Sequence, residues 1–140
     1  MTERDGLGRT GPHYAAASPD TESLRALPAA GADVDGADDA GWTPLHFAAQ
    51  AQAQAQAPAP VEILLAAGAT VDAADRHGTT PLWRAVFCSR GQTAVIRLLL
   101  DAGADPDRKN RHGVGPRGLA DRIANYDLGG VFSSGDRGSA

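Results

Sequence analysis

The apolar residues of this chain fall in short clusters separated by Gly- and Asp-rich segments, and no apolar run approaches the ~20 residues that span a membrane. The pair Thr43-Pro44 suits the start of a helix over 44–50, because Thr accepts a capping hydrogen bond and Pro needs no donor at the first helical position. A second apolar cluster, 61–67, ends at Gly68, which suits a left-handed helix cap. One side of the first helix should present Leu45, Ala48 and Ala49.

This arrangement recurs along the chain. The segment Gly-Ala-x-x-Asp begins at Gly31, Gly68 and Gly103, so its first Gly returns after 37 and then 35 residues. A helix start like that at 43–44 follows at 80–81, and a degraded copy follows at 113–116. Such periods indicate stacked helical units, none of which buries its apolar face alone. We expect one continuous core between the units that contains Leu64, Leu65, Leu98 and Leu99.

The repeated pattern Gly-x-Thr-Pro-Leu-His-x-Ala-Ala, followed by Val-x-x-Leu-Leu-x-x-Gly-Ala, resembles the ankyrin repeat. The resemblance implies an all-α solenoid of about four repeats, two well formed and two degenerate at the ends. Each repeat would be a helix–turn–helix with a projecting β-turn finger. The expected boundaries are 9–37, 38–74, 75–109 and 110–132 within a domain spanning 9–132, with a disordered tail at 1–8 and a flexible one at 133–140.

Departures from the pattern concern loops and one motif position. Four extra residues in the Ala-Gln tract at 51–60 and two near 88–92 are interpreted as neutral loop insertions, although Ala and Gln could also extend the first helix. By resemblance, His13 and His46 tie a helix start to the finger backbone. Trp83 replaces this His in the next copy, and we expect it to pack in the core or between repeats.

Charge is distributed unevenly. The net charge of −4 gives no reason to expect a nucleic-acid partner. Residues 1–75 carry three Arg against eleven Asp and Glu, whereas 76–140 carry ten Arg and Lys against six Asp, so an elongated fold would have a dipole along its axis. The N-terminus lacks the apolar stretch of a secretory signal. We expect a monomeric, cytoplasmic protein without a cofactor or membrane contact.

Candidate catalytic and metal-binding patterns each lack a required part. The Gly-x-Gly-x-x-Gly match at 6–11 has no strand before it. The carboxylates at 33–39 lack the residues needed at the fifth and twelfth positions of an EF-hand. His77 and His112 have no third ligand nearby in sequence for zinc, and Cys88 has no base beside it. An enzyme or a metal-dependent regulator is therefore the remote alternative.

The resemblance instead implies partner binding through a groove lined by the fingers and by the ends of the first helices. A protein–protein interaction module or adaptor with an acidic or mixed-charge protein partner is the leading hypothesis. The alternative is an immunity protein that neutralises a cognate bacterial toxin, because some small stand-alone bacterial-type ankyrin proteins resemble immunity proteins. Expected contact residues are Asp39, Trp42, Gln50, Arg76, His77, Thr79, Phe87, Arg111, His112 and Val114, with Ala40, Ala51 and Cys88 beside them.

Overall fold

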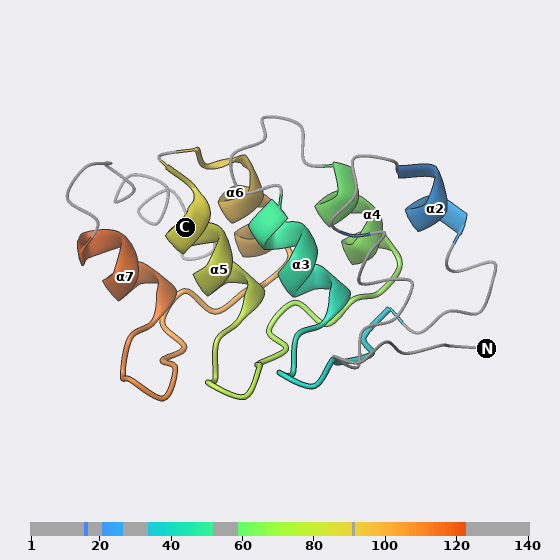
Figure 1. The fold of residues 1–140 in the computed structure, drawn as a ribbon. Coiled ribbons are helices and arrows are strands. Elements are labelled where there is room, and N and C mark those ends of the chain that lie inside the picture. The colour runs from blue at the N-terminus through green and yellow to red at the C-terminus, as the bar shows by residue number, and fades with distance from the viewer. Residues whose placement is uncertain (1–15, 17–20, 27–33, 52–58, 91, 123–140) are drawn as a thin grey trace.

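The computed structural model describes residues 16, 21–26, 34–51, 59–90 and 92–122, and arranges their helices in two layers (Figure 1). Consecutive helices alternate between the layers, so each layer pairs helices that are one repeat apart. The all-α solenoid predicted from the sequence is confirmed. One layer holds α3 (Pro44–Ala51), α5 (Pro81–Cys88) and α7 (Pro116–Arg122), and the other holds α2 (Thr21–Ala26), α4 (Ala59–Ala66) and α6 (Ala94–Asp101).

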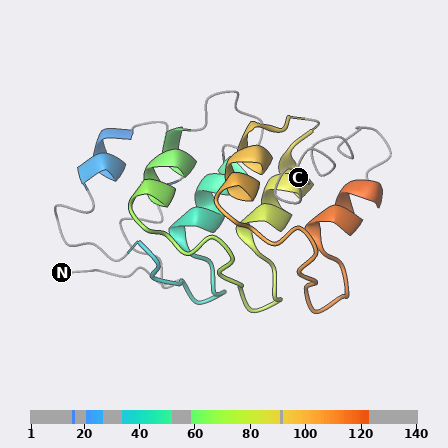
Figure 2. The same cartoon turned by 180° about the vertical axis from the view of Figure 1, so that it is seen from behind.

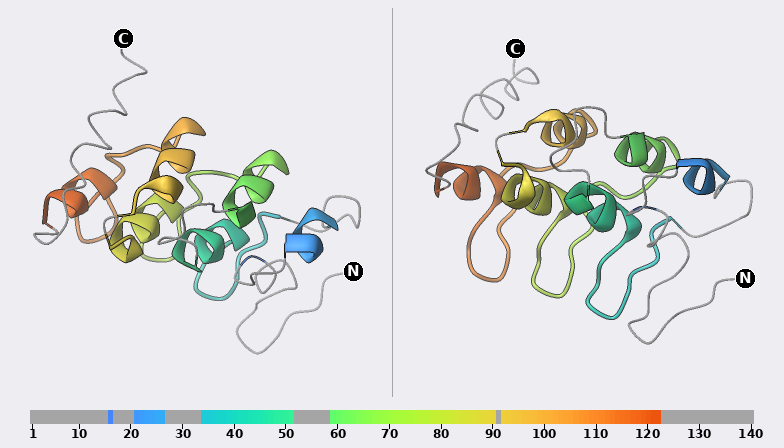
Figure 3. Two further views of the ribbon diagram at one scale, coloured as in Figure 1. Left: turned by 90° about the horizontal axis from the view of Figure 1, so that it is seen from above. Right: turned by 45° about the horizontal axis from the view of Figure 1, so that its top comes forward.

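Three finger loops precede α3, α5 and α7 and project from the same edge of the helical layers (Figure 2). Seen obliquely, the fingers stand side by side below these helices (Figure 3). The layer of α3, α5 and α7 is therefore the one next to the fingers. None of the described helices is long and apolar enough to cross a membrane.

The helix ends follow the signals in the sequence. The hydroxyl of Thr80 caps α5 by accepting a hydrogen bond of 3.4 Å from the backbone N–H of Trp83. After α4, Gly68 has φ +92°, and the following N–H of Ala69 donates to the carbonyl of Leu64 at 3.0 Å. This is a Schellman cap, and the end of α6 repeats it.

The core lies between the two layers. Leu64 and Leu99 are fully buried in it, as expected, and Leu65 and Leu98 are only partly buried and pack against its edge. Successive Leu residues on a helix point about 100° apart, so the pair cannot both face the core centre. The remaining large, fully buried aliphatic side chains are Leu45, Val61, Leu82, Val86, Val95 and Ile96.

Aspartates at the finger bases connect adjacent repeats. The carboxylate of Asp35 accepts hydrogen bonds of 2.8 Å from both the N–H and the hydroxyl of Thr70. One repeat later, Asp72 accepts the backbone N–H of Asp105 at 3.1 Å. Burial raises the pKa of Asp72, and the hydrogen bond from Asp105 opposes this shift. These contacts fix the register between neighbouring fingers.

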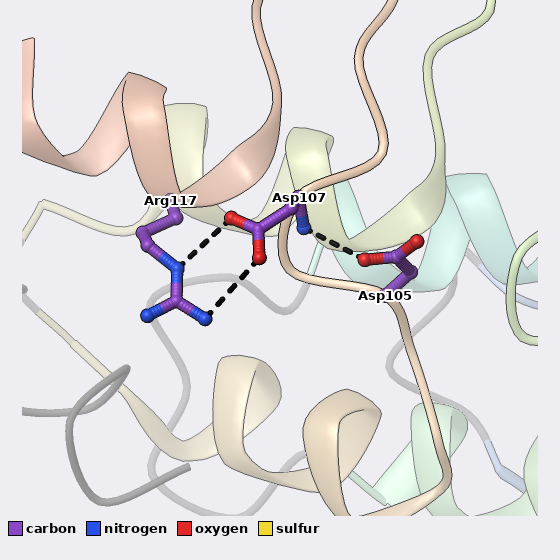
Figure 4. A network of polar contacts seen from close by, with 3 residues as sticks. All are labelled: Asp105, Asp107 and Arg117. Carbon is purple, nitrogen blue, oxygen red and sulfur yellow. Dashed lines mark hydrogen bonds and ion pairs between the residues drawn. The ribbon is translucent and has the colours of Figure 1, made fainter. Parts of the chain in front are cut away.

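In the third finger base, the carboxylate of Asp107 contacts Arg117 of helix α7 instead of the next finger (Figure 4). The N–H of Asp107 donates to Asp105 at 2.9 Å, and the guanidinium of Arg117 donates to both Asp107 oxygens, at 2.9 and 3.4 Å. The ion pair joins this finger base to α7. Because both side chains are well exposed, it adds little to stability.

Several predictions fall outside the described residues. They concern most of the first repeat with His13, the tails at 1–8 and 133–140, most of the Ala-Gln tract, and the end of the last repeat after residue 122. The repeat boundaries at both ends of the domain stay predictions.

Candidate functional site

Each finger is shaped by one short polar side chain. Oδ1 of Asp38 accepts the N–H groups of Ala40 and Trp42, both at 2.9 Å. Asp75 does the same for residues 77 and 79, and Asn110 for residues 112 and 114. Asp and Asn suit this role because their oxygens reach backbone N–H groups two residues on. The sequence therefore folds all three finger tips alike.

Adjacent fingers are hydrogen-bonded to each other. The N–H of Arg76 donates to the carbonyl of Ala40 at 3.0 Å, and one repeat later Arg111 donates to His77 at 2.8 Å. The approach is so close that a Cβ on Gly41 would lie 2.9 Å from the backbone nitrogen of Arg76. The fingers thus form one continuous wall rather than separate loops.

His46 fastens this wall to the helices. Its Nδ1 accepts the N–H of Thr43 at 3.1 Å, so the proton sits on Nε2, which donates to the carbonyl of Thr79 in the next finger at 2.8 Å. Burial lowers the pKa of His46, and the Thr79 carbonyl and the nearby Asp75 partly oppose the shift. The structural role implied for His46 is what the geometry shows.

A groove of about 430 Å³ lies between the three fingers and helix α5. Five residues predicted from the sequence line it: Trp42, His77, Thr79, His112 and Val114. Its other lining residues are Ala40, Asp75, Trp83, Arg84 and Asn110. Ala40 was expected beside the groove, whereas the other four were not assigned to it from the sequence.

Arg84 occupies the centre of this surface. Its guanidinium carbon lies 5.1 Å from the ring centre of Trp42, 5.9 Å from that of Trp83 and 5.3 Å from that of Phe87. Its Nε donates to the side-chain oxygen of Gln50 at 3.0 Å, and Nη2 donates to the same oxygen. Three aromatic rings and one amide from the preceding repeat therefore hold the cation in place.

Trp83 and Phe87 extend the aromatic surface along α5. Their rings stack with centres 5.4 Å apart, and Phe87 is 56% exposed. Trp83 was expected to pack in the core or between repeats. It lies outside the core, is half-buried, and lines the groove together with residues of the neighbouring fingers. Unlike His46 at the matching position, Trp83 has no hydrogen-bond acceptor for its buried ring N–H among the described residues.

The remaining predicted contact residues lie outside the lining of the groove. Asp39, Arg76 and Arg111 are exposed on the fingers. Gln50 is exposed and reaches the groove through Arg84, and Phe87 is exposed on α5 beside the groove. A role in partner contact stays a prediction for all ten residues.

The missed residues Trp83 and Arg84 carried a usable signal. Side chains three and four positions apart share a helix face, so Phe87, already placed in the groove, marks both as its neighbours. The partner of Arg84 was harder to find, because Gln50 is 34 residues away.

Within the described part of the chain, no three His, Cys, Asp or Glu side chains are grouped so that they could hold a metal ion. Cys88, the one cysteine of the sequence, is half-buried at the end of α5.

Comparison with protein families places this sequence pattern among known repeats. A family model described as ankyrin repeats, in three copies, matches residues 4–110, which is most of the chain. A search among curated proteins finds no match.

Proposed function

The chain belongs to the ankyrin-repeat family, and we propose that it binds a protein partner through the groove between its fingers and helix α5. Ankyrin repeats are generally protein–protein interaction modules, and proteins of this family are typically not enzymes. The proposal adds the location of the binding surface and its anchoring residues.

The observation that carries the proposal is the exposed aromatic surface beside the groove. Phe87 is the large apolar side chain most exposed among the described residues, and it stacks on Trp83 with Arg84 against both rings. Aromatic residues and Arg dominate the energetics of protein interfaces, where a few of them supply most of the affinity. Ring stacking also fixes these side chains before binding, which reduces the entropy lost on association.

The supporting framework is rigid for a structural reason. His46 links α3 to the second finger, and the hydrogen bond from Arg76 to Ala40 links that finger to the first. Both walls of the groove are therefore held by contacts between repeats. A partner would meet a preformed surface, as is usual for tight complexes.

Capture from a cell extract, followed by mass spectrometry, tests the proposal when wild type is compared with two variants. Phe87→Ser removes the exposed ring, and Glu62→Ala alters an exposed residue of α4 in the other layer as the matched control. We expect a partner that wild type and the control both retain and that Phe87→Ser loses. Equal capture by all three would place the binding surface elsewhere.

The identity of the captured protein decides between the two specific roles. A toxin whose activity is blocked by the purified chain would make this an immunity protein. A partner without toxic activity would make it an adaptor.

A further inference from the structure

We propose that Arg84 binds a single carboxylate of the partner, an Asp or Glu side chain, while the rings of Trp83 and Phe87 take an apolar residue next to it in the partner's sequence. This inference rests on the proposed function and specifies the chemistry that the groove recognises. The occupant is thus an acidic–apolar segment of a protein.

The first step of the argument is the unused hydrogen-bonding capacity of Arg84. Its guanidinium carries five N–H donors, and Gln50 accepts from Nε and Nη2 only. Both N–H groups of Nη1 and one of Nη2 have no acceptor among the described residues, and no carboxylate of those residues forms an ion pair with Arg84. A carboxylate accepts two parallel N–H groups of a guanidinium in one plane, so it fits this vacant fork.

The second step is that Asp75, the one carboxylate that lines the groove, already accepts hydrogen bonds from the finger backbone. Oδ1 of Asp75 accepts the N–H of His77 at 2.8 Å and that of Thr79 at 3.0 Å, and the residue is buried. Asp75 therefore serves the finger turn, and among the described residues no ion pair joins it to Arg84. The groove keeps a positive centre beside an apolar surface.

The third step is that, among the described helices next to the fingers, this helix position is basic only in α5. Arg84 aligns with Phe47 in α3 and with Leu119 in α7, so the same position is apolar in both neighbouring helices. Arg117, a basic residue in the first turn of α7, is paired with Asp107 of the preceding finger base. One cation flanked by apolar positions matches one acidic residue flanked by apolar ones.

Charge also selects against a polyanion. The chain carries a net charge of −4, and Asp39 is exposed on the finger next to Trp42. Nucleic-acid affinity arises from many phosphate contacts with Lys and Arg, whereas Arg84 is the one Lys or Arg among the residues that line this groove. An isolated carboxylate in a protein segment avoids that repulsion.

The test uses a random-peptide phage library selected on the purified full-length chain. We expect enriched peptides with Asp or Glu next to an aromatic or long aliphatic residue. A synthetic peptide from this set should bind Arg84→Gln about tenfold more weakly than wild type, because a charge-assisted pair is lost. Arg97→Gln, an exposed change on α6, is the matched control and should bind as wild type does.

The decisive measurement varies the peptide as well. Changing its acidic residue to the matching amide should weaken binding to wild type about tenfold and have little effect on binding to Arg84→Gln. Arg84→Glu should regain affinity for a peptide whose acid is replaced by Lys. The peptide change leaves the protein intact, so it remains informative even if an Arg84 variant folds poorly.

Other results overturn the inference. Enriched peptides without acidic residues, equal effects of Arg84→Gln and Arg97→Gln, or competition by a short single-stranded oligonucleotide would each do so. If capture of the partner depends on Phe87 but not on Arg84, the proposed function stands and this inference falls. If capture depends on neither, both fall.

Discussion

The contact between adjacent fingers can be tested with a matched pair of glycine substitutions. Gly41 has φ +85° and Gly113 has φ +78°, so an Ala at either site adopts the left-handed region. Their surroundings differ. A Cβ on Gly41 would lie 2.9 Å from both the nitrogen of Arg76 and the α-carbon of Asp75, whereas a Cβ on Gly113 would meet nothing within 4 Å.

The expected magnitudes follow from this difference. Left-handed backbone costs about 1–2 kcal/mol for a residue with a Cβ, so Gly113→Ala should lose that amount of folding free energy. Gly41→Ala should lose about 1 kcal/mol more, because the second finger must move and its hydrogen bond from Arg76 to Ala40 weakens, a bond worth about 0.5–1.5 kcal/mol. Gly78→Ala, with the nearest atom at 3.3 Å, should fall between the two.

Urea denaturation of the three variants measures these differences, and amide hydrogen exchange locates them. The amide of Arg76 should exchange faster in Gly41→Ala and at the wild-type rate in Gly113→Ala, because only the former displaces its acceptor. Equal free energies of unfolding for Gly41→Ala and Gly113→Ala would refute the reasoning. The fingers would then be independent turns.

Three further predictions concern the core, pH and association. Leu99→Ala should cost about 2–5 kcal/mol in urea denaturation, and Leu98→Ala clearly less, because Leu99 is fully buried and Leu98 is not. Because the pKa of His46 is lowered in the folded chain, its imidazole takes up a proton at about pH 6.5 in the unfolded chain but stays neutral at that pH in the folded chain. The free energy of unfolding should stay constant above that pH and decrease as the pH drops toward the lowered pKa of the folded chain. In a plot of the urea unfolding midpoint against pH, His46→Gln should remove most of this decrease. Replacing Arg76 and Arg111 with Glu should leave the melting temperature nearly unchanged, since both are exposed, and slow association with the captured partner about tenfold at low salt in stopped-flow measurements.

The fold could be predicted from the sequence because its signals are local. Gly68 and Gly103 cap α4 and α6 with positive φ, and Thr80 with Pro81 starts α5, as expected for residues whose backbone preferences are strong. Burial within a helix was less predictable. Leu98 and Leu99 are adjacent and identical residues, so the sequence does not distinguish their burial. The direction in which α6 packs decides that Leu99 reaches the core and Leu98 lies at its edge.

The groove was predictable in outline, because finger positions recur with the repeat and five of the expected residues line it. Its centre was not, since the position of Arg84 depends on Gln50 and Trp42 from the preceding repeat. Pairs so far apart in sequence leave no periodic signal. Trp83 was not assigned to the groove from the sequence, where it takes the position of His46; His46 is fully buried, whereas Trp83 is half-buried and lines the groove.

The basic residues of this surface divide into two kinds with different consequences for binding. Arg76 and Arg111 are exposed at finger tips, where solvent and salt screen their charge within about 8 Å, so they act on the approach of a partner. Arg84 is half-buried and held by three rings and Gln50, so its contact forms only when the partner is seated and then resists dissociation. Charge reversal at the tips should therefore alter the salt dependence of association. The change Arg84→Gln should instead raise the dissociation rate at any salt concentration, and if it altered association alone, Arg84 would be a third steering charge rather than the anchor of the groove.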